Sequence, residues 1–260
     1  MAKVLVTSHL GRHFRIFGHY DYKVLLSMGH EVHIAANFNE EIDRFDDPNI
    51  IKHQIDFIRN PFSIANYKAL KQLEKLFDNI HFDIIHTQSP AGGAITRLAA
   101  KKSRKKGTKV IYTAHGFHFY KGAPLLNWSL YYPIEKWLSY YTDVLITINK
   151  EDYECAQRLD AQKIRYIPGI GVDTYKICNT IIDRSSKRSI LEIPENDIML
   201  LSVGELIKRK NHEAILRAVA TLKDLNITYA ICGRGVLDSY LKQLSVELGI
   251  SDKVKFLGYR

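Results

Sequence analysis

Short apolar runs alternate with helical patterns along nearly the whole chain, and this alternation restricts the fold more than any other feature. Residues 3–7 form a β-branched strand pattern, a helical pattern extends to Met28, and residues 31–36 form a second strand pattern. Strands that are joined by helices pair in parallel, with helices on both faces of the sheet. The sequence therefore predicts an α/β fold with doubly wound parallel sheets.

The same pattern continues through the first half of the chain. Further strands are expected over residues 51–56, 83–86, 110–113 and 144–148, and further helices over residues 65–77, 91–106, 128–141 and 150–159. In a sheet of this kind, ligands bind beyond the carboxyl ends of the strands. The polar residues that directly follow each strand are therefore the first candidates for a functional site.

A glycine-containing segment divides the chain. Residues 163–173 contain a short strand pattern followed by Pro168, Gly169 and Gly171. Glycine permits backbone angles that are closed to other residues, so the segment predicts a hinge, with a plain tight turn as the alternative. After a polar surface segment at residues 179–190, strands are expected over 198–203, which has a buried pattern, 227–231 and 254–257. We therefore expect two domains, residues 1–173 and residues 174–260.

Composition limits the partners and the cell compartment. The chain of 260 residues carries a formal net charge of +9, which favours nucleic acid, an anionic membrane or phosphorylated metabolites. It has three cysteines at irregular spacings, expected to be reduced, and it contains neither a membrane-spanning apolar run nor a secretory signal pattern. These features predict a cytoplasmic protein.

A basic run and an aromatic segment mark one part of the first half. Six of the residues 101–109 are Lys or Arg, and residues 128–141 include two Trp and four Tyr. The basic run is typical of the solvated end of a helix, and the aromatic residues are typical of a packed helix. Together they are also typical of peripheral association with an anionic membrane.

Three loops carry histidine or glycine to the same predicted edge of the first sheet. They contain Ser8, His9, Gly11, Arg12 and His13 after the first strand, His86, Gln88, Ser89, Gly92 and Gly93 after the fourth, and His115, Gly116, His118 and Tyr120 after the fifth. One histidine after a strand is more often structural than catalytic, but three such loops at one edge favour a site. Their spacing fits no metal-binding motif, so we expect no metal site and no cofactor.

The second half contains a possible anion site. Lys208, Arg209 and Lys210 lie in a loop between a strand and a helix. Backbone amides at the start of a helix and a nearby lysine suit a diphosphate, whereas the alternative is a basic surface loop. Gly233 lies in a Cys-Gly-Arg-Gly segment that resembles part of a dinucleotide-binding motif, although one Gly-x-Gly is weak evidence.

Several segments together resemble one enzyme family. The chain contains, in order, SMGHEVHIAAN, FDIIHTQSP, VIYTAHGFHFYKG, YTDVLITINKED, YIPGIGVD, LLSVGELIKRKNHEAI, ICGRG and VKFLGY. This order resembles the retaining glycosyltransferases of the GT-B fold, family 4, and most closely the bacterial enzymes of capsular and exopolysaccharide synthesis. The resemblance covers the whole chain. It implies two Rossmann-like domains that face each other across a cleft, with the acceptor mainly on the first domain and the nucleotide-sugar donor mainly on the second.

The resemblance also implies roles for individual residues. His115, the candidate catalytic residue, matches the family histidine beside the donor sugar, and Lys210 matches the lysine that holds the diphosphate. Donor-binding residues would include Gly11, Gly204, Arg209 and Gly233, and candidates on the acceptor side are His86, His118 and Tyr120. The partners implied are a nucleotide sugar and a saccharide or lipid-linked acceptor. Nucleic-acid binding is supported by charge alone.

Two features depart from the family pattern. Glu205 stands where the family commonly has an arginine, so Lys208 or Arg209 would have to compensate in holding the phosphates. The chain ends at Arg260, before the family's Glu-x7-Glu motif, so we expect a truncated enzyme with an incomplete second domain. A sugar-nucleotide epimerase of the same fold and an inactive remnant that only binds remain alternatives. A nicotinamide dehydrogenase is disfavoured because the first loop lacks Gly-x-Gly-x-x-Gly.

Overall fold

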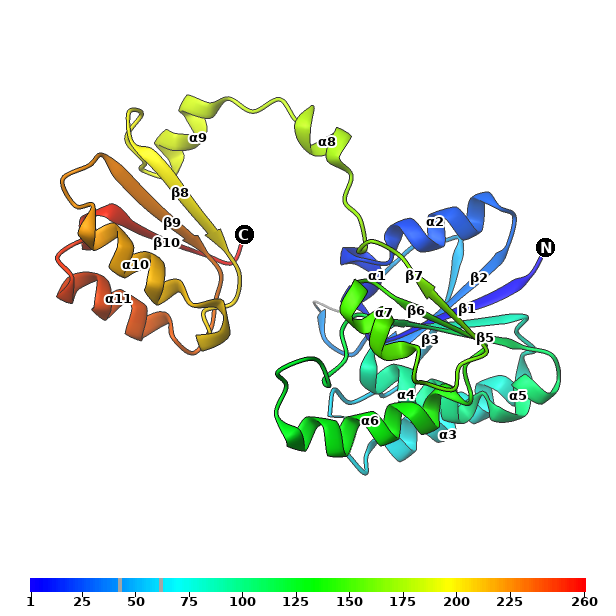
Figure 1. Ribbon diagram of the computed structural model, residues 1–260. Coiled ribbons are helices and arrows are strands. Elements are labelled where there is room, and N and C mark those ends of the chain that lie inside the picture. Colours follow the sequence, from blue (N-terminus) through cyan, green and yellow to red (C-terminus); the bar gives the residue numbers. More distant parts are fainter. Residues whose placement is uncertain (42–43, 61–62) are drawn as a thin grey trace. The chain divides into compact units, whose positions relative to one another are not determined.

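The chain folds into two compact units. The computed structural model describes residues 1–41, 44–60 and 63–260, and the units are Met1–Val172 and Asp173–Arg260 (Figure 1). The division between Val172 and Asp173 thus falls at the end of the segment 163–173, in which proline and glycine interrupt the pattern. Gly169 and Gly171 have φ angles of 87° and 82°, which are backbone conformations that glycine adopts without steric cost.

The first unit is built on a parallel seven-stranded sheet of order β3-β2-β1-β4-β5-β6-β7. The strands are β1 (Lys3–Leu10), β2 (Glu31–Asn37), β3 (Ile50–Gln54), β4 (Ile84–Thr87), β5 (Lys109–Ala114), β6 (Val144–Thr147) and β7 (Lys163–Tyr166). The chain leaves β1 toward one side of the sheet and returns to β4 on the other side of β1. This reversal of direction places the ends of β1 and β4 next to each other.

Helices cover both faces of this sheet. They are α1 (Arg12–Ile16), α2 (His19–Ser27), α3 (Asn66–Asn79), α4 (Pro90–Ala99), α5 (Lys101–Lys105), α6 (Leu125–Ser139) and α7 (Lys150–Ala156) (Figure 1). Val4 and Val6 pack with Phe14 of α1, whereas Leu5 packs with Leu73 of α3 on the opposite face. Successive residues of a strand point to opposite faces, so one apolar run supplies both cores. Each fully buried side chain of this size contributes roughly 1.5–3 kcal/mol.

The second unit contains a smaller parallel sheet of order β10-β9-β8. Its strands are β8 (Ile198–Val203), β9 (Ile227–Cys232) and β10 (Val254–Gly258), and its helices are α8 (Thr174–Cys178), α9 (Arg184–Ile190), α10 (His212–Thr221) and α11 (Asp238–Glu247), with short 3-10 turns at Lys208–Lys210 and Ser251–Lys253. Leu216 of α10 and Leu241 of α11 pack on Tyr229 of β9. The predicted α/β fold with parallel sheets is confirmed in both units.

One expectation for the second unit is confirmed and another needs correction. The polar segment at residues 179–190 is largely exposed, as expected of a surface segment, and it contains α9, which Asp183 caps by accepting a hydrogen bond from Ser186 N at 3.1 Å. The prediction that residues 198–203 form a buried strand is wrong, since Ile198, Leu201 and Val203 are 61%, 55% and 75% exposed. β8 lies at an edge of the sheet, and α10 and α11 pack against one face of it.

Candidate functional site

The carboxyl ends of β1, β4 and β5 bring four polar side chains together. His13 Nε2 lies 3.1 Å from Gln88 Oε1, and the His13 and His115 rings are 5.8 Å apart and nearly perpendicular. His86 of β4 lies close enough to His115 for the charge of His115 to affect the pKa of His86. The Nε2 atom of His86 is 2.8 Å from Thr113 Oγ1. The histidines that the sequence places after three different strands thus share one edge of the sheet.

Burial keeps these imidazoles uncharged. Desolvation lowers the pKa of His13 and of His86 to about 4, and it also lowers the pKa of His115. At neutral pH each ring is therefore neutral and can both donate and accept one hydrogen bond. His115 Nε2 is buried without a hydrogen-bond partner among the described residues. A buried nitrogen of this kind is costly to leave unpaired, so it is suited to receive a ligand group.

Beside His115 lies a small pocket with aromatic walls. It has a volume of about 60 Å³ and is lined by Pro90, Tyr112, Gly116, Phe117, His118, Phe119, Tyr131 and Glu135. His118 stacks on Tyr131 with ring centroids 4.6 Å apart. Glu135 accepts two hydrogen bonds from the fully buried Arg97, at 2.5 and 3.1 Å. The pocket thus offers flat apolar surfaces and a fixed carboxylate.

The three candidates for the acceptor side lie in different surroundings. His118 lines this pocket and is exposed. Tyr120 is 45% exposed outside it, and its carbonyl accepts a hydrogen bond from Trp128 Nε1 at 3.2 Å. The side chain of His86 is turned toward Thr113 within the sheet. The structure therefore brings only His118 of the three into the pocket beside His115.

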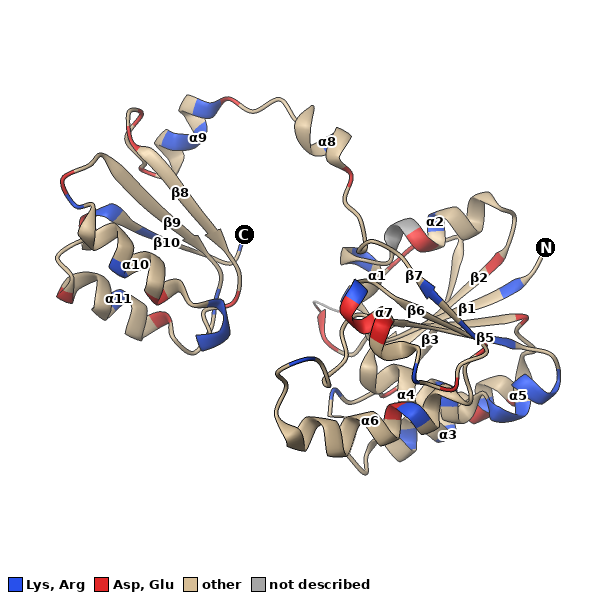
Figure 2. Ribbon diagram, viewed as in Figure 1, with Lys and Arg blue, Asp and Glu red and all other residues tan. Residues whose placement is uncertain are grey.

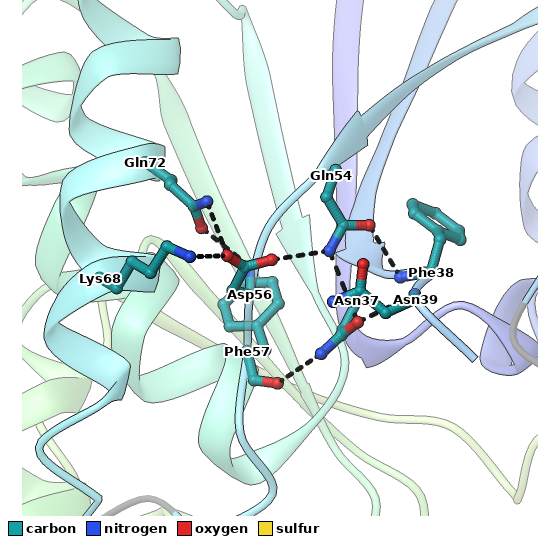
Figure 3. Close-up of polar contacts among 8 residues, drawn as sticks. All are labelled: Asn37, Phe38, Asn39, Gln54, Asp56, Phe57, Lys68 and Gln72. Atoms are coloured by element: carbon teal, nitrogen blue, oxygen red, sulfur yellow. Dashed lines mark hydrogen bonds and ion pairs between the residues drawn. The ribbon is translucent and has the colours of Figure 1, made fainter.

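Gly11 is tied to the end of β2. Its backbone N–H donates to Asn37 O at 3.0 Å, and Asn37 Nδ2 in turn donates to Phe57 O at 3.2 Å. Figure 3 shows Asn37 beside a network centred on Asp56, whose carboxylate binds Lys68 at 2.7 Å and accepts hydrogen bonds from Gln54 and Gln72. The hydrogen bond with Lys68 is the main cause that lowers the pKa of Asp56 to about 2. The loop after β1 therefore rests on an ordered polar edge.

The second unit has its own cavity at the carboxyl edge of its sheet. It has a volume of about 390 Å³ and is lined by Val203, Gly204, Glu205, Cys232, Gly233, Arg234, Tyr259 and Arg260. The loops after β8 and β9 meet here, because Gly204 N donates to Cys232 O at 2.9 Å and Leu206 N donates to Arg234 O at 3.0 Å. A Cβ at position 233 would lie only 1.8 Å from Gly204 O, so the contact requires glycine.

Lys208, Arg209 and Lys210 do not line this cavity, but the side chain of Lys210 lies next to Gly204, which does. A Cβ at position 204 would meet the Lys210 side chain at 3.6 Å, which places the aliphatic stem of Lys210 over Gly204. Lys208, Arg209 and Lys210 are exposed, and none of them forms an ion pair with a described carboxylate. Figure 2 shows their positive charge as a compact group before α10. The cavity therefore has one cation, Lys210, at its border and two, Arg234 and Arg260, in a lining that also contains Glu205, and this excess of positive charge suits an anion.

His212 was not predicted as part of this site, yet it fixes the loop. His212 is buried, its Nε2 lies 3.2 Å from Glu205 O, and its Nδ1 lies 3.4 Å from Tyr229 Oη, which donates to Ser202 Oγ at 2.9 Å. The residue before it, Asn211, adopts a left-handed conformation with φ of 52°. The only signal in the sequence was a histidine directly after a basic loop. The Cys-Gly-Arg-Gly segment of the sequence also contains Arg234, whose cation lines the cavity.

Two features are absent from the described residues. In that part of the chain, no three His, Cys, Asp or Glu side chains are grouped as a metal ion would require. No described helix has the length and apolar character needed to cross a bilayer.

The fold is shared with solved glycosyltransferases. A glycosyltransferase from Rickettsia africae ESF-5 superposes with a TM-score of 0.71 at 18% identity, covering 100% of this chain and 68% of that one. WaaG, a glycosyltransferase involved in lipopolysaccharide biosynthesis, gives a TM-score of 0.67 at 16% identity, covering 99% and 70%. UDP-GlcNAc 2-epimerase from Neisseria meningitidis gives 0.63 at 13% identity, covering 99% and 72%. The fold is that of the GT-B class.

Sequence comparison then shows the family. The profile for Glycosyltransferase Family 4 matches residues 22–175, and the profile for Glycosyl transferases group 1 matches residues 183–260. EpsD of Bacillus subtilis (strain 168), whose name assigns it provisionally to the glycosyltransferases, is 40% identical over 99% of this chain and 68% of its own length. The chain belongs to glycosyltransferase family 4.

A second relative has a more specific name. The UDP-Gal:alpha-D-GlcNAc-diphosphoundecaprenol alpha-1,3-galactosyltransferase of Escherichia coli is 32% identical over 78% of this chain. The match spans 54% of that enzyme's length. Both relatives are thus longer than the region that this chain matches.

Proposed function

We propose that this protein transfers a sugar from a nucleotide-sugar donor to a lipid-linked saccharide acceptor, with retention of configuration, in bacterial surface-polysaccharide synthesis. The observation that carries the proposal is the cationic cavity of the second unit, formed by the loops after β8 and β9 in a chain of glycosyltransferase family 4. The name of the Escherichia coli relative, which specifies UDP-galactose and a diphosphoundecaprenol acceptor, supports these two substrate classes.

The donor diphosphate is assigned to the loop at Gly204 and to Lys210. Gly204 has no side chain, so a phosphate can approach its backbone closely, and the stem of Lys210 lies over this residue. Arg234 lines the same cavity and supplies a second cation. Transfer separates charge as the nucleoside diphosphate leaves, and fixed cations stabilise that charge. Arg209 and Gly233 are assigned to the same site, with Gly233 acting through the contact between the two loops.

The acceptor is assigned to the first unit, near His115. We assign His115, the candidate catalytic residue, to the donor sugar, because its buried Nε2, which has no hydrogen-bond partner among the described residues, suits a sugar hydroxyl. The pocket at His118 and Tyr131 offers stacked rings and the Glu135 carboxylate, which suit the apolar face and the hydroxyl groups of a saccharide. His86 and Tyr120 are assigned supporting positions for the acceptor, and Gly11 keeps its assignment as a donor-binding residue.

We also propose that the protein binds peripherally to the anionic inner face of the membrane. Leu126, Leu130 and Trp137 lie on one face of α6 and are 72%, 40% and 51% exposed. The neighbouring α5 is strongly basic, and Lys101 Nζ lies 4.9 Å from the centre of the Trp137 ring (Figure 2). Apolar and basic groups side by side are suited to a lipid surface.

The membrane proposal is tested by sedimentation with vesicles. The chain should sediment with phosphatidylglycerol vesicles and stay in solution with phosphatidylcholine vesicles. Leu126→Ser should weaken the binding several-fold, because it removes apolar area that would enter the lipid. The matched control is Leu222→Ser, at the C-cap of α10, because Leu222 is 44% exposed and lies outside the proposed lipid-binding face. This variant should bind the vesicles like the wild type. Equal sedimentation with both lipids would contradict the proposal.

The activity is tested by transfer from a panel of UDP-, GDP- and ADP-sugars to undecaprenyl diphosphate saccharides. Product should form with at least one donor, and its new bond should have the donor's anomeric configuration by NMR. Lys210→Ala should reduce turnover by roughly 100-fold, which is the scale for the loss of one charge stabiliser at a reacting centre. Product of inverted configuration would refute retention, and donor hydrolysis without transfer would refute the acceptor assignment.

An epimerase is the second candidate, because UDP-GlcNAc 2-epimerase has the same fold at 13% identity. Exchange of solvent deuterium into C2 of the donor sugar, without transfer, would favour that activity. A protein that binds the donor and catalyses neither reaction would be the inactive remnant. The family match favours transfer, since the two profiles cover residues 22–175 and 183–260.

A further inference from the structure

A chain of hydrogen bonds connects three segments of the first unit and ends at an imidazole. Gln88 Nε2 donates to Asp21 Oδ2 at 2.7 Å, and Gln88 Oε1 lies 3.1 Å from His13 Nε2. His13 lies in α1, Asp21 in α2, and Gln88 directly after β4. Gln88 is only 5% exposed, so its amide has few alternative partners in solvent. Three side chains from separate segments of the first unit are thus joined by hydrogen bonds.

The direction of these bonds determines which nitrogen of His13 carries the proton. A carboxylate accepts hydrogen bonds and does not donate them, so Asp21 holds the nitrogen of the Gln88 amide and turns the amide oxygen toward His13. An amide oxygen also accepts only, so His13 Nε2 must donate. In a neutral ring Nδ1 is then an acceptor. Burial lowers the pKa of His13 to about 4, which keeps the ring neutral at pH 7.

His13 lies beside the imidazole assigned to the substrate. Its ring centroid is 5.8 Å from that of His115, at an interplanar angle of 86°. His9 and His115 lower the pKa of His13 by their charge, and Asp21 raises it. These are the titratable groups that act on His13, and they lie in α2, at the end of β1 and in the loop after β5. A neutral histidine with a defined acceptor nitrogen therefore stands next to His115.

We propose that Asp21 and Gln88 are positioning residues that hold His13 as its Nε2–H tautomer, so that His13 Nδ1 accepts a hydrogen bond from a hydroxyl of the sugar substrate beside His115. The substrate in this inference rests on the proposed function. The tautomer rests only on the hydrogen bonds between Asp21, Gln88 and His13. The two parts can therefore be tested separately.

The tautomer is measured by long-range ¹H–¹⁵N spectra of the chain with ¹⁵N-labelled histidine at pH 7.5, with His13 assigned by comparison with His13→Gln. The wild-type spectrum should show a single Nε2–H tautomer. Asp21→Asn should give averaged shifts of both tautomers, because an Asn side chain can present either a donor or an acceptor and releases the Gln88 amide. Asp78→Asn, an exposed position on α3, is the matched control and should leave His13 unchanged.

An Nδ1–H tautomer in the wild type would overturn the inference, and an unchanged tautomer in Asp21→Asn would remove Asp21 from it. In the transfer assay, Asp21→Asn should lower kcat about tenfold, the scale for one hydrogen bond, while the thermal midpoint stays within about 2 °C. A changed tautomer with unchanged turnover would show that the chain of bonds is structural. Absence of transfer by the wild type would refute the substrate contact together with the proposed function, and the spectra would still decide the tautomer.

Discussion

Replacing Gly233 by alanine should separate the two loops that form the cavity of the second unit. The new Cβ would lie 1.8 Å from Gly204 O and 2.9 Å from Gly204 C, whereas Cβ contacts below 3.0 Å are essentially never seen. The loops would have to move apart by more than about 1 Å, which strains the hydrogen bonds from Gly204 N to Cys232 O and from Leu206 N to Arg234 O. Overpacking costs roughly 1–3 kcal/mol, and each lost buried hydrogen bond costs roughly 1–3 kcal/mol. We therefore expect the free energy of unfolding of the second unit to fall by about 3–5 kcal/mol.

Hydrogen–deuterium exchange of peptides from residues 173–260 measures this loss. Both tryptophans, Trp128 and Trp137, lie in the first unit, so tryptophan fluorescence in the same samples reports whether that unit is unaffected. Gly249→Ala is the matched control, since Gly249 also has a positive φ of 67° but open space around its Cβ position, and it should cost only about 1–2 kcal/mol. If Gly233→Ala destabilises the second unit no more than Gly249→Ala does, the close contact between the loops is not what requires glycine.

Further predictions concern the first unit. Glu135→Ala should lower its free energy of unfolding by about 3–5 kcal/mol, because the fully buried Arg97 loses its carboxylate, whereas Glu74→Ala in an exposed pair should cost less than about 1 kcal/mol. Urea unfolding followed by tryptophan fluorescence distinguishes these values, and equal losses would show that the buried pair is not structurally important. Three half-buried histidines should make this unit sensitive to acid. The pKa of each is 6.5 in the unfolded chain and about 4 in the folded chain. As the pH falls, the unfolded state therefore binds protons first. The free energy of unfolding should be highest above pH 6.5 and decrease from there toward pH 4. These residues are His13, His53 and His86. A urea midpoint that stays constant between pH 7 and pH 4.5 would contradict this account.

The strand–helix alternation was sufficient to predict the fold because it depends on local sequence. Val4, Leu5 and Val6 form an apolar run that is buried on both faces in a parallel sheet. The same reasoning failed for β8, whose apolar run looks identical. Ile198 and Val203 are exposed because burial depends on which elements cover a strand, and the strand's own residues do not contain that information.

The candidate site was predictable only in part. His115 and Lys210 could be named because each follows a strand in a recognisable segment. The hydrogen bonds from Gln88 to Asp21 and to His13 join residues separated by 67 and 75 positions, and no local pattern predicts such pairs. Gly233 had only the weak signal of one Gly-x-Gly, whereas its close approach to Gly204 becomes apparent once the loops are packed.

The central claim is that the cavity beside Lys210 binds the diphosphate of a nucleotide sugar. Isothermal titration of the 260-residue chain with UDP, GDP and ADP tests it most directly, because the diphosphate is common to all three. At least one nucleotide should bind, and Lys210→Ala should weaken its binding about 10- to 100-fold, as expected for a hydrogen bond to a charged group. Lys223→Ala, which removes an exposed lysine without a described partner, should bind like the wild type. Binding that is the same in Lys210→Ala and in the wild type, or no binding of any of the three nucleotides, would contradict the account.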